Sequence, residues 1–549
     1  MDRIALPLPA LLIAVICLIP LVGVGAAAAM GSFETVAGLW DTVLLGYALN
    51  TLGLVLLVGA MTGVIGCATA WLVVTTEFRG RRWLEIALVI PLAFPAYVLA
   101  YAYTDILDHP GIVQTSLRAL TGWGPRDYWF PEVRSLGGAA VMLTLVLYPY
   151  VYLLARAAFR LQAADPFFAA RSLGASSMAA FFTVALPVAR PAIAAGVLLV
   201  VMETIADFGT VAHFGVRTFA TGIYTSWFSM ADRGAAAQLA LVLLAFALIV
   251  AALEQANRGK ASYDARGRRQ PFARIALSGR RAVAAQAICV APVLFGVLIP
   301  TATLIAMATS SEQDIFSSRY QAFIQNSLLL GAVAAIVTVA AAVLLTSYNR
   351  FRRGRVSQGA LYIARLGYAV PGGVIAVGLM VPFAGFDNWL DARMEAAFGI
   401  STGLLITGSM WLMIAAYMIR FMAAALGAYD SGLATVTGNI DNASRVLGQS
   451  TLRTIQRIHV PLLAPSVLTA LLIVFVDTVK ELPATLILRP FNFDTLAVQA
   501  FRLASDERLN GAAVPSLMIA AIGLVPVMLL CLQIGGWRAS ARSGAATTA

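Results

Sequence analysis

Charge and chemically reactive side chains are scarce in this chain. Only 12% of its 549 residues are charged, three are His and four are Cys. No two Cys follow the C-x-x-C spacing and none stands near a His, so the sequence indicates neither a disulfide framework nor a zinc site. The phosphate-binding pattern G-x-x-x-x-G-K-[ST] is absent, and no catalytic constellation is visible. We therefore expect a chain that is not an enzyme and binds no cofactor itself.

Apolar side chains are abundant instead. They make up 60% of the residues, and the mean hydropathy is +0.83. A soluble protein of this length could not bury so much apolar surface, so lipid must solvate it. The net charge is +11, but the arginines lie between apolar runs, as the positive-inside rule requires. The predicted partner is therefore membrane lipid and not nucleic acid.

The apolar runs predict an all-α polytopic membrane protein with about twelve spans, since about 20 apolar residues cross a bilayer. The runs lie near 9–29, 43–74, 84–106, 137–159, 188–211, 235–254, 283–308, 322–347, 360–384, 402–425, 462–488 and 511–534.

The chain repeats itself at an offset of 274 residues. Residues 168–191 and 442–465 align without a gap, with glycines at 174 and 448 (448 − 174 = 274) and prolines at 187 and 461 (461 − 187 = 274). A period of half the chain indicates one unit present twice. We therefore predict two homologous six-span domains, residues 1–254 and 282–549, joined by a basic linker at 255–281.

Each copy of the repeated segment combines small residues, a glycine and a proline. This order predicts a short helix, a glycine turn, a second short helix and a proline that opens a membrane span. A single copy would fit a plain amphipathic connector, but two copies at equal spacing favour a specific contact. The residues of the pattern are Ala169, Ala170, Gly174, Leu186 and Pro187 in the first copy and Ala443, Ser444, Gly448, Val460 and Pro461 in the second. His459 lies inside the second copy, where we expect it to contact a partner.

Arginine counting predicts the orientation. Clusters at 79–82, 254–281 and 350–355 lie between spans, whereas the alternate connections at 31–41 and 386–398 are acidic or mixed. The arginine-rich side is the cytoplasm. Both termini and both repeated segments are therefore predicted to be cytoplasmic.

Four carboxylates within apolar runs repeat at the same offset. Glu203 pairs with Asp477 (477 − 203 = 274) and Asp207 with Glu481 (481 − 207 = 274). A spacing of four predicts that each pair shares a helix face, and acids in a membrane tend to face a pathway. They either line an outer gate of a translocation pathway or pair locally with Lys480, Arg217 or Arg489. Oxygen ligands suit a hard cation such as ferric iron, but no metal ligand is assigned.

The repeated segment resembles the EAA loop of ABC-importer permeases, E-A-A, three residues, G, nine residues, I-x-L-P. The first copy keeps A-A…G…V-x-L-P and the second A-S…G…I-x-V-P, while Phe168 and Asn442 replace the leading Glu. The segments ETIADFGTVAHFGVRTFATGIYTSW (203–227) and DTVKELPATLILRPFNFDTLAVQAF (477–501) are similar to fused, two-domain ferric-iron permeases of this class.

The resemblance implies a type I ABC-importer permease fold in a bacterial inner membrane. Two ATPase subunits, carrying ATP and Mg²⁺, would dock on the segments 168–187 and 442–461, which we call the first and second coupling loops. A periplasmic binding protein would deliver ferric iron. Two alternatives remain: a permease of the same type for thiamine, sulfate or a phosphonate, and a major-facilitator transporter, which also has twelve spans and a Gly/Arg-rich connection such as 76–82.

Overall fold

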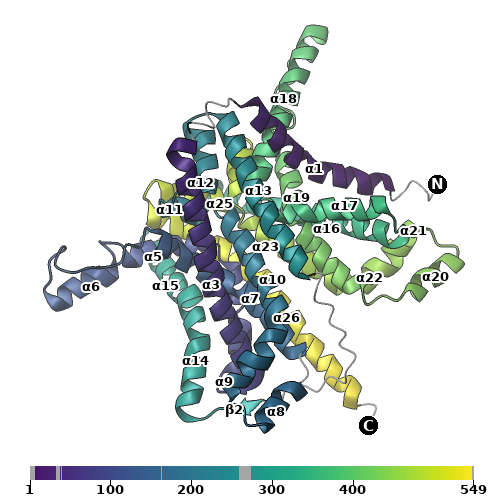
Figure 1. Ribbon diagram of the computed structural model, residues 1–549. Coiled ribbons are helices and arrows are strands. Elements are labelled where there is room, and N and C mark those ends of the chain that lie inside the picture. The colour runs from purple at the N-terminus through teal and green to yellow at the C-terminus, as the bar shows by residue number, and fades with distance from the viewer. Residues whose placement is uncertain (1–6, 32–37, 39, 162–163, 259–273, 547–549) are drawn as a thin grey trace. The chain divides into compact units, whose positions relative to one another are not determined.

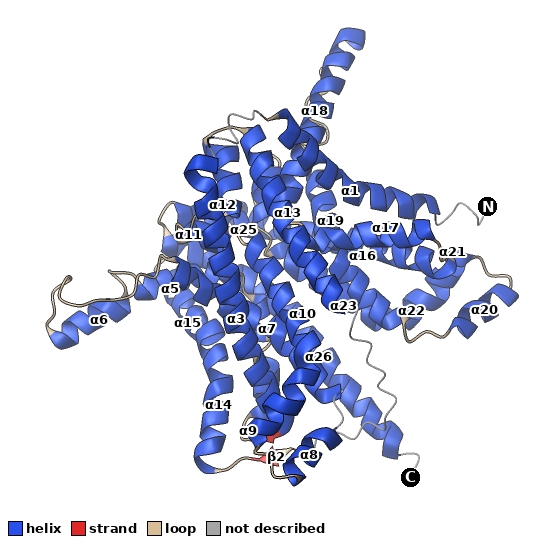
Figure 2. Ribbon diagram, in the orientation of Figure 1, coloured by secondary structure: helices blue, strands red, loops and turns tan. Residues whose placement is uncertain are grey.

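The protein is described by a computed structural model that covers residues 7–31, 38, 40–161, 164–258 and 274–546. This part of the chain is almost wholly helical (Figure 2). The strands found in it are β1 (Thr76–Glu77) and β2 (Ile275–Ala276), which pair in parallel with Thr76 opposite Ile275. Most of the predicted linker, 259–273, lies outside the described residues.

The number of spans agrees with the prediction. Ten helices in the described ranges are long and apolar enough to cross a membrane, or up to twelve if two bent pairs each count as one span. The all-α polytopic fold is confirmed.

Three runs that were each predicted to form one continuous span are instead broken, at prolines or at a kink. The run at 84–106 is two stretches, Arg81–Ala93 and Ala96–Thr121, at 94° to each other. The run at 360–384 breaks at Val370, and its span is Gly372–Phe398. Residues that precede a proline favour extended backbone, and Phe94 and Val370, before Pro95 and Pro371, are both extended.

The run at 462–488 is the third broken span. It bends by 82° between Thr451–Leu462 and Ala464–Val479, and its apolar continuation forms a separate short helix. The tenth predicted span is intact but shifted, to Met410–Leu433 instead of 402–425.

The described helices pack in two compact units. Unit 1 comprises Met1–Leu45, Phe219–Ala245 and Gln313–Arg502, and unit 2 comprises Gly46–Thr218, Phe246–Glu312 and Leu503–Ala549. The helices mainly in unit 1 are α1 (Pro7–Met30), α12 (Phe219–Tyr224), α16 (Ser318–Phe351), α17 (Arg355–Leu366), α18 (Gly372–Phe398), α19 (Met410–Leu433), α20 (Gly438–Val446), α21 (Thr451–Thr454), α22 (Val460–Leu462), α23 (Ala464–Val479), α24 (Pro483–Leu488) and α25 (Leu496–Ser505).

Unit 2 is built around long helices that run side by side, with α7 packed on α10 (Figure 1). Its helices are α3 (Leu45–Thr75), α4 (Arg81–Ala87), α5 (Ala96–Leu107), α6 (Ile112–Thr121), α7 (Leu136–Leu161), α8 (Ala164–Ser172), α9 (Ser177–Ala180), α10 (Leu186–Ala206), α11 (Gly209–His213), α14 (Gly279–Val293), α15 (Ile299–Thr309) and α26 (Leu509–Ala546). Helix α13 (Arg233–Arg258) is divided between the units.

The first span of each sequence repeat packs with helices of the other repeat. In unit 1, α1 crosses α18 so closely that a Cβ added at Gly23 would lie 2.0 Å from the carbonyl oxygen of Gly378. In unit 2, α15 of the second repeat packs on α5 of the first repeat and also on α26 of its own repeat. Small residues allow such close helix crossings in membranes. The compact units therefore do not coincide with the boundaries predicted at 254 and 282, which stay a prediction about the sequence repeat.

Candidate functional site

The first coupling loop contains the predicted glycine turn. Gly174, which follows α8, has φ +92°. Its N–H donates to the carbonyl of Arg171 at 3.1 Å, and the N–H of Ala175 donates to the carbonyl of Ala170 at 3.0 Å. This pair of bonds is a Schellman motif, which satisfies the last carbonyls of a helix and reverses the chain.

The second coupling loop repeats that geometry. Gly448, which follows α20, has φ +72°. Its N–H donates to the carbonyl of Arg445 at 3.0 Å, and the N–H of Gln449 donates to the carbonyl of Ser444 at 3.1 Å. The predicted helix, glycine turn and second helix are therefore present in both copies.

Sequence reasoning missed the serine that starts the second helix of each loop. Ser176 Oγ accepts from the N–H of Ala179 at 3.1 Å, and Ser450 Oγ accepts from the N–H of Arg453 at 3.4 Å. A serine two residues after the turn glycine was the available signal, because Ser is a preferred N-cap.

A π-helical turn precedes the proline in both loops, at Phe181–Ala185 and Ile455–His459. Leu186-Pro187 and Val460-Pro461 follow these turns directly. Proline lacks an N–H and its ring collides with the preceding α-helical turn. A wider turn relieves that collision. In the first loop the helix then continues within the span Ser177–Ala206, whereas in the second loop it bends by 82° after Leu462.

The loop surfaces are apolar and basic. The most exposed large side chains are Leu173 (89%) in the first loop and Val446 (87%) and Leu447 (76%) in the second. Of the predicted motif residues, Ala169, Gly174, Ala443, Gly448 and Pro461 are exposed, Ala170, Leu186, Pro187 and Val460 are partly buried, and Ser444 is buried. The leucine before each glycine thus offers more contact area than the small residues of the motif.

Aromatic rings attach the first loop to unit 2. Trp71 of α3 makes ring contacts with Phe159, Phe167 and Phe181, with centroid distances of 5.2, 5.4 and 4.8 Å. These rings come from α7, α8 and the π turn, respectively. Such pairs stabilise beyond the area they bury, so α3 and α7 position the loop through apolar contacts.

A buried ionic triad attaches the second loop to unit 1. Asp441 of α20 accepts from Arg350 Nε at 2.7 Å through one oxygen and from His459 Nε2 at 2.7 Å through the other. Arg350, on α16, also donates to the carbonyls of Leu433 and Val436 at 3.1 and 2.8 Å. The triad therefore joins both short helices of the loop to a membrane span.

The surroundings of the triad keep Asp441 charged. Burial alone would raise the pKa of its carboxyl, but hydrogen bonds from Arg350 and His459 lower the pKa below its ordinary value. The resulting stabilisation is present above the ordinary carboxyl pKa and is lost as the pH falls through the lowered one. His459 is fully buried and stacks on Phe351 at 5.6 Å, so the prediction that His459 contacts a partner is wrong.

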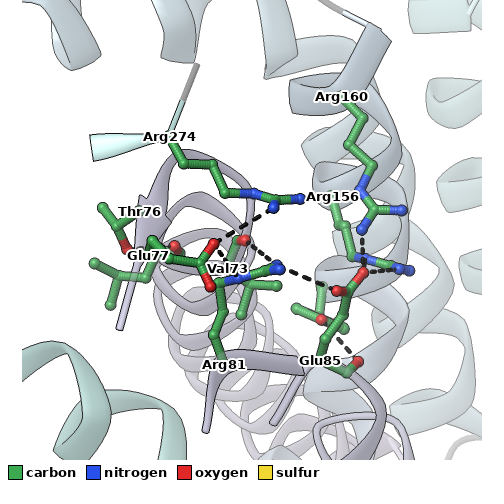
Figure 3. Close-up of polar contacts among 10 residues, drawn as sticks. Val73, Thr76, Glu77, Arg81, Glu85, Arg156, Arg160 and Arg274 are labelled. Atoms are coloured by element: carbon green, nitrogen blue, oxygen red, sulfur yellow. Dashed lines mark hydrogen bonds and ion pairs between the residues drawn. The ribbon is translucent and has the colours of Figure 1, made fainter. Parts of the chain in front are cut away.

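A second ionic cluster lies at the base of the first loop (Figure 3). Glu85 of α4 accepts from Arg81 at 3.3 Å and pairs with Arg156 and Arg160 near the end of α7. Glu85 is 5% exposed, and a carboxylate in such a position is stable only when it is paired and hydrogen-bonded. The cluster thus fixes the end of the helix that leads into the first coupling loop.

The same cluster extends to the segment that precedes α14. Arg81 pairs with Glu77 of β1 at 3.1 Å, and Arg274 pairs with the same oxygen at 3.4 Å (Figure 3). Beside this ion pair, the N–H of Leu277 donates to the carbonyl of Glu77 at 3.0 Å. The end of the linker between the repeats is therefore attached to the connection between the second and third predicted spans.

The intramembrane acids do not share helix faces as predicted. Helix α10 ends at Ala206 and α23 ends at Val479, so Asp207 and Glu481 lie beyond them. Asp207 accepts from the N–H groups of Thr210 and Val211 at 3.1 and 3.2 Å. Glu481 accepts from the N–H of Ala484 at 3.0 Å. Capping of the next short helix, α11 or α24, is thus the visible role of the second acid in each pair.

Local ion pairs engage both acids of the second repeat. Lys480 Nζ lies 2.8 Å from Asp477, and Arg420 Nε lies 3.4 Å from Glu481. Glu203, the counterpart of Asp477, is partly buried. The alternative of structural pairing therefore holds for Asp477 and Glu481, and gate lining stays a prediction. Among the described residues, no group of three His, Cys, Asp or Glu side chains is arranged to hold a metal ion.

Comparison with known proteins finds similarity to transport permeases. Residues 62–259 match the family described as binding-protein-dependent transport system inner membrane component. The chain is 25% identical over 482 residues to the Fe(3+)-transport system permease protein FbpB 2 of Haemophilus influenzae, covering 86% of each. It is 27% identical over 487 residues to the probable ABC transporter permease protein y4fN of Sinorhizobium fredii, covering 82% of this chain and 79% of that protein.

A shorter likeness covers 38% of the chain. The molybdenum transport system permease protein ModB of Escherichia coli is 26% identical over 219 residues, which are 38% of this chain and 89% of ModB. The family match and the relatives confirm the resemblance predicted from the coupling loops, and they favour it over a major-facilitator transporter.

Proposed function

We infer that this chain, a multi-pass inner-membrane permease of the ABC-importer type, forms the pathway through which an ATP-driven importer moves ferric iron. The observation that carries the inference is the repeated coupling loop, because two identical Schellman turns 274 residues apart present equivalent surfaces to a partner. Iron as the cargo rests on the relatives that bear the name of ferric permeases and cover most of the chain.

The loops are proposed to receive two ATPase subunits, one on each loop. Exposed apolar residues next to the turn, such as Leu173 and Leu447, would enter a cleft on each ATPase. ATP and Mg²⁺ would be bound by those subunits and not by this chain. Closure of the ATPases would push the loops together and open the pathway outward, and hydrolysis would reset it.

The orientation is proposed from the arginines. With both termini and both loops in the cytoplasm, a periplasmic binding protein would deliver iron to the opposite face. Glu203, Asp207, Asp477 and Glu481 would then lie toward that outer face, where the short helices that follow α10 and α23 begin. We propose that these turns border the outer gate.

One other cargo class is supported by a specific observation. The likeness to the molybdenum permease ModB and the 28% identity over 127 residues to the putative 2-aminoethylphosphonate permease PhnV of Salmonella typhimurium favour molybdenum or a phosphonate. These matches cover 38% and 23% of the chain, so iron is preferred.

The test is transport by the whole complex in proteoliposomes that contain the chain, its ATPase and its binding protein. We expect ATP-dependent uptake of radioactive ferric iron that excess unlabelled ferric iron suppresses and that molybdate and 2-aminoethylphosphonate do not. Uptake of molybdate or 2-aminoethylphosphonate without iron uptake would show that the cargo is not iron, and the ATP-driven mechanism would still stand. Uptake of iron without an ATPase would overturn the mechanism itself.

A further inference from the structure

Helix α6 buries polar side chains and exposes large apolar ones. In the sequence IVQTSLRALT, the polar Gln114 and Arg118 lie on one face, while Ile112, Val113 and Leu120 lie on the other. The polar side is buried: Gln114 is 7% exposed. The opposite side faces outward, with Ile112 70% and Leu120 87% exposed and Ser116 exposed between them.

Hydrogen bonds to the segments before and after α6 account for this orientation. Gln114 donates to the carbonyl of Leu107 at 2.9 Å and accepts from the hydroxyl of Tyr128 at 2.8 Å. Arg118 donates to Tyr128 at 2.9 Å and to the carbonyl of His109 at 3.0 Å. Arg118 is the one charged residue of α6, so the outward face of this helix carries no charge.

The loop that follows α6 exposes two tryptophans. Trp129 is 85% exposed, and Trp123, which is 46% exposed, stacks on Tyr128 at 5.7 Å. Trp and Tyr concentrate at membrane–water interfaces because their rings suit the headgroup region. We call the outward surface formed by Ile112, Val113 and Leu120 the α6 face.

The direction of α6 fits a position in the plane of the membrane. The stretch that contains α5 and α6 turns by 94° from Arg81–Ala93. In Figure 1, α6 projects to the left of the long helices α3, α7 and α14 of unit 2 and runs roughly across their direction. It sits away from the end that holds α8, α9 and β2 (Figure 1), which is the end predicted to be cytoplasmic.

The helix that leads into α6 packs beside an exposed apolar membrane span. Helix α5, which leads into α6, packs on α15. Helix α15 belongs to the membrane span Gly279–Thr309, and its neighbour Leu298 and its own Ile305 are 56% and 51% exposed. An apolar, uncharged helix face beside such a span is suited to the boundary between headgroups and acyl chains.

We propose that α6 is an interfacial helix whose apolar face is inserted into the outer leaflet of the membrane. The tryptophans of the following loop lie at headgroup level, and the polar face binds the segments before and after α6. The helix thereby anchors the far end of α5, opposite the point where the third span is broken. This role is independent of the cargo.

Site-specific fluorescence quenching tests the proposal on the full chain in vesicles of phosphatidylethanolamine and phosphatidylglycerol. Bimane is attached to Leu120→Cys on the α6 face and, as the matched control, to Thr115→Cys, about 140° around the same helix. The four native cysteines are buried, so background labelling is small. We expect a nitroxide near the top of the acyl chain to quench the label at 120 at least twofold more than the label at 115, and aqueous iodide to show the reverse order.

A second labelling position on the same face distinguishes an ordered helix from a locally misfolded one. Ile112→Cys lies on the same face and should behave as Leu120→Cys, a periodicity that a disordered loop would not produce. Equal quenching at 112, 115 and 120 would overturn the proposal. So would iodide access at 120 that disappears only when the binding protein is added, since the face would then dock a protein.

Discussion

The two coupling loops have the same backbone and different attachments. Both turn at a glycine with a Schellman motif, both start the second helix with a serine cap, and both contain a π turn before the proline. Position 167 is a phenylalanine packed on Trp71, whereas its counterpart at 441 is an aspartate paired with Arg350 and His459. The shape that a partner contacts is thus separable from the chemistry that attaches the loop to its unit.

The attachment of the second loop explains how this chain manages without the Glu of the EAA pattern there. Asn442 occupies that position and is exposed, while the carboxylate one residue earlier, Asp441, makes the ion pair with Arg350. In the first loop Phe168 stands at the Glu position and contacts Phe167 at 5.8 Å. The first loop is attached through rings.

The largest effect should follow from breaking the triad. Asp441→Asn leaves Arg350 without its carboxylate in a buried site, which costs about 3–5 kcal/mol for such pairs. We expect faster hydrogen–deuterium exchange in peptides covering 438–461 and unchanged exchange in 164–187. Asn442→Ser is the control, because it alters an exposed neighbour only. Unchanged exchange in 438–461 would show that the triad does not hold the loop.

A smaller loss should follow from removing the central ring of the first loop. Trp71→Ala deletes contacts with three phenylalanines and should cost about 2–3 kcal/mol, since Trp71 is only partly buried. Exchange should increase in 164–187 and not in 438–461, and Trp71→Phe should restore part of the protection. Equal loosening of both loops would mean that they do not have separate attachments.

The smallest local change should have equal effects on both loops. Gly174→Val and Gly448→Val each force a side chain into a left-handed backbone, at about 1–2 kcal/mol, with no other atom within 4 Å of the added Cβ. Because the turn shapes the surface offered to the ATPase, we expect ATP hydrolysis stimulated by the binding protein to be uncoupled from iron uptake in both variants. Normal hydrolysis with normal uptake in both would contradict a coupling role for the turns.

Local sequence signals predicted the loops and the spans well. Each of these signals depends on a few neighbouring residues and is visible in the chain. They are a glycine flanked by helix formers, a proline at a fixed distance and runs of apolar residues. The breaks after Phe94 and Val370 could also have been predicted, because Pro95 and Pro371 follow these residues. The triad was not, because Arg350 and Asp441 are 91 residues apart and nothing near either residue indicates its partner.

The acids of the broken spans show the same limit. A spacing of four indicates one helix face only if the helix continues, and α10 and α23 end before the second acid. An acid directly after a helix was better placed to cap the next one, as Asp207 and Glu481 do.

The amino-acid order alone determined the duplication, the membrane environment and the turn of each coupling loop, since these depend on composition and on φ preferences of neighbouring residues. Tertiary structure decided which helices pack together: α1 joins the helices of the second repeat, and α14 and α15 join those of the first. It also decided whether rings or charges attach each loop. Packing brings together residues that are distant in the chain. In a duplicated sequence, each helix has two similar sets of helices on which it could pack, and only folding decides between them.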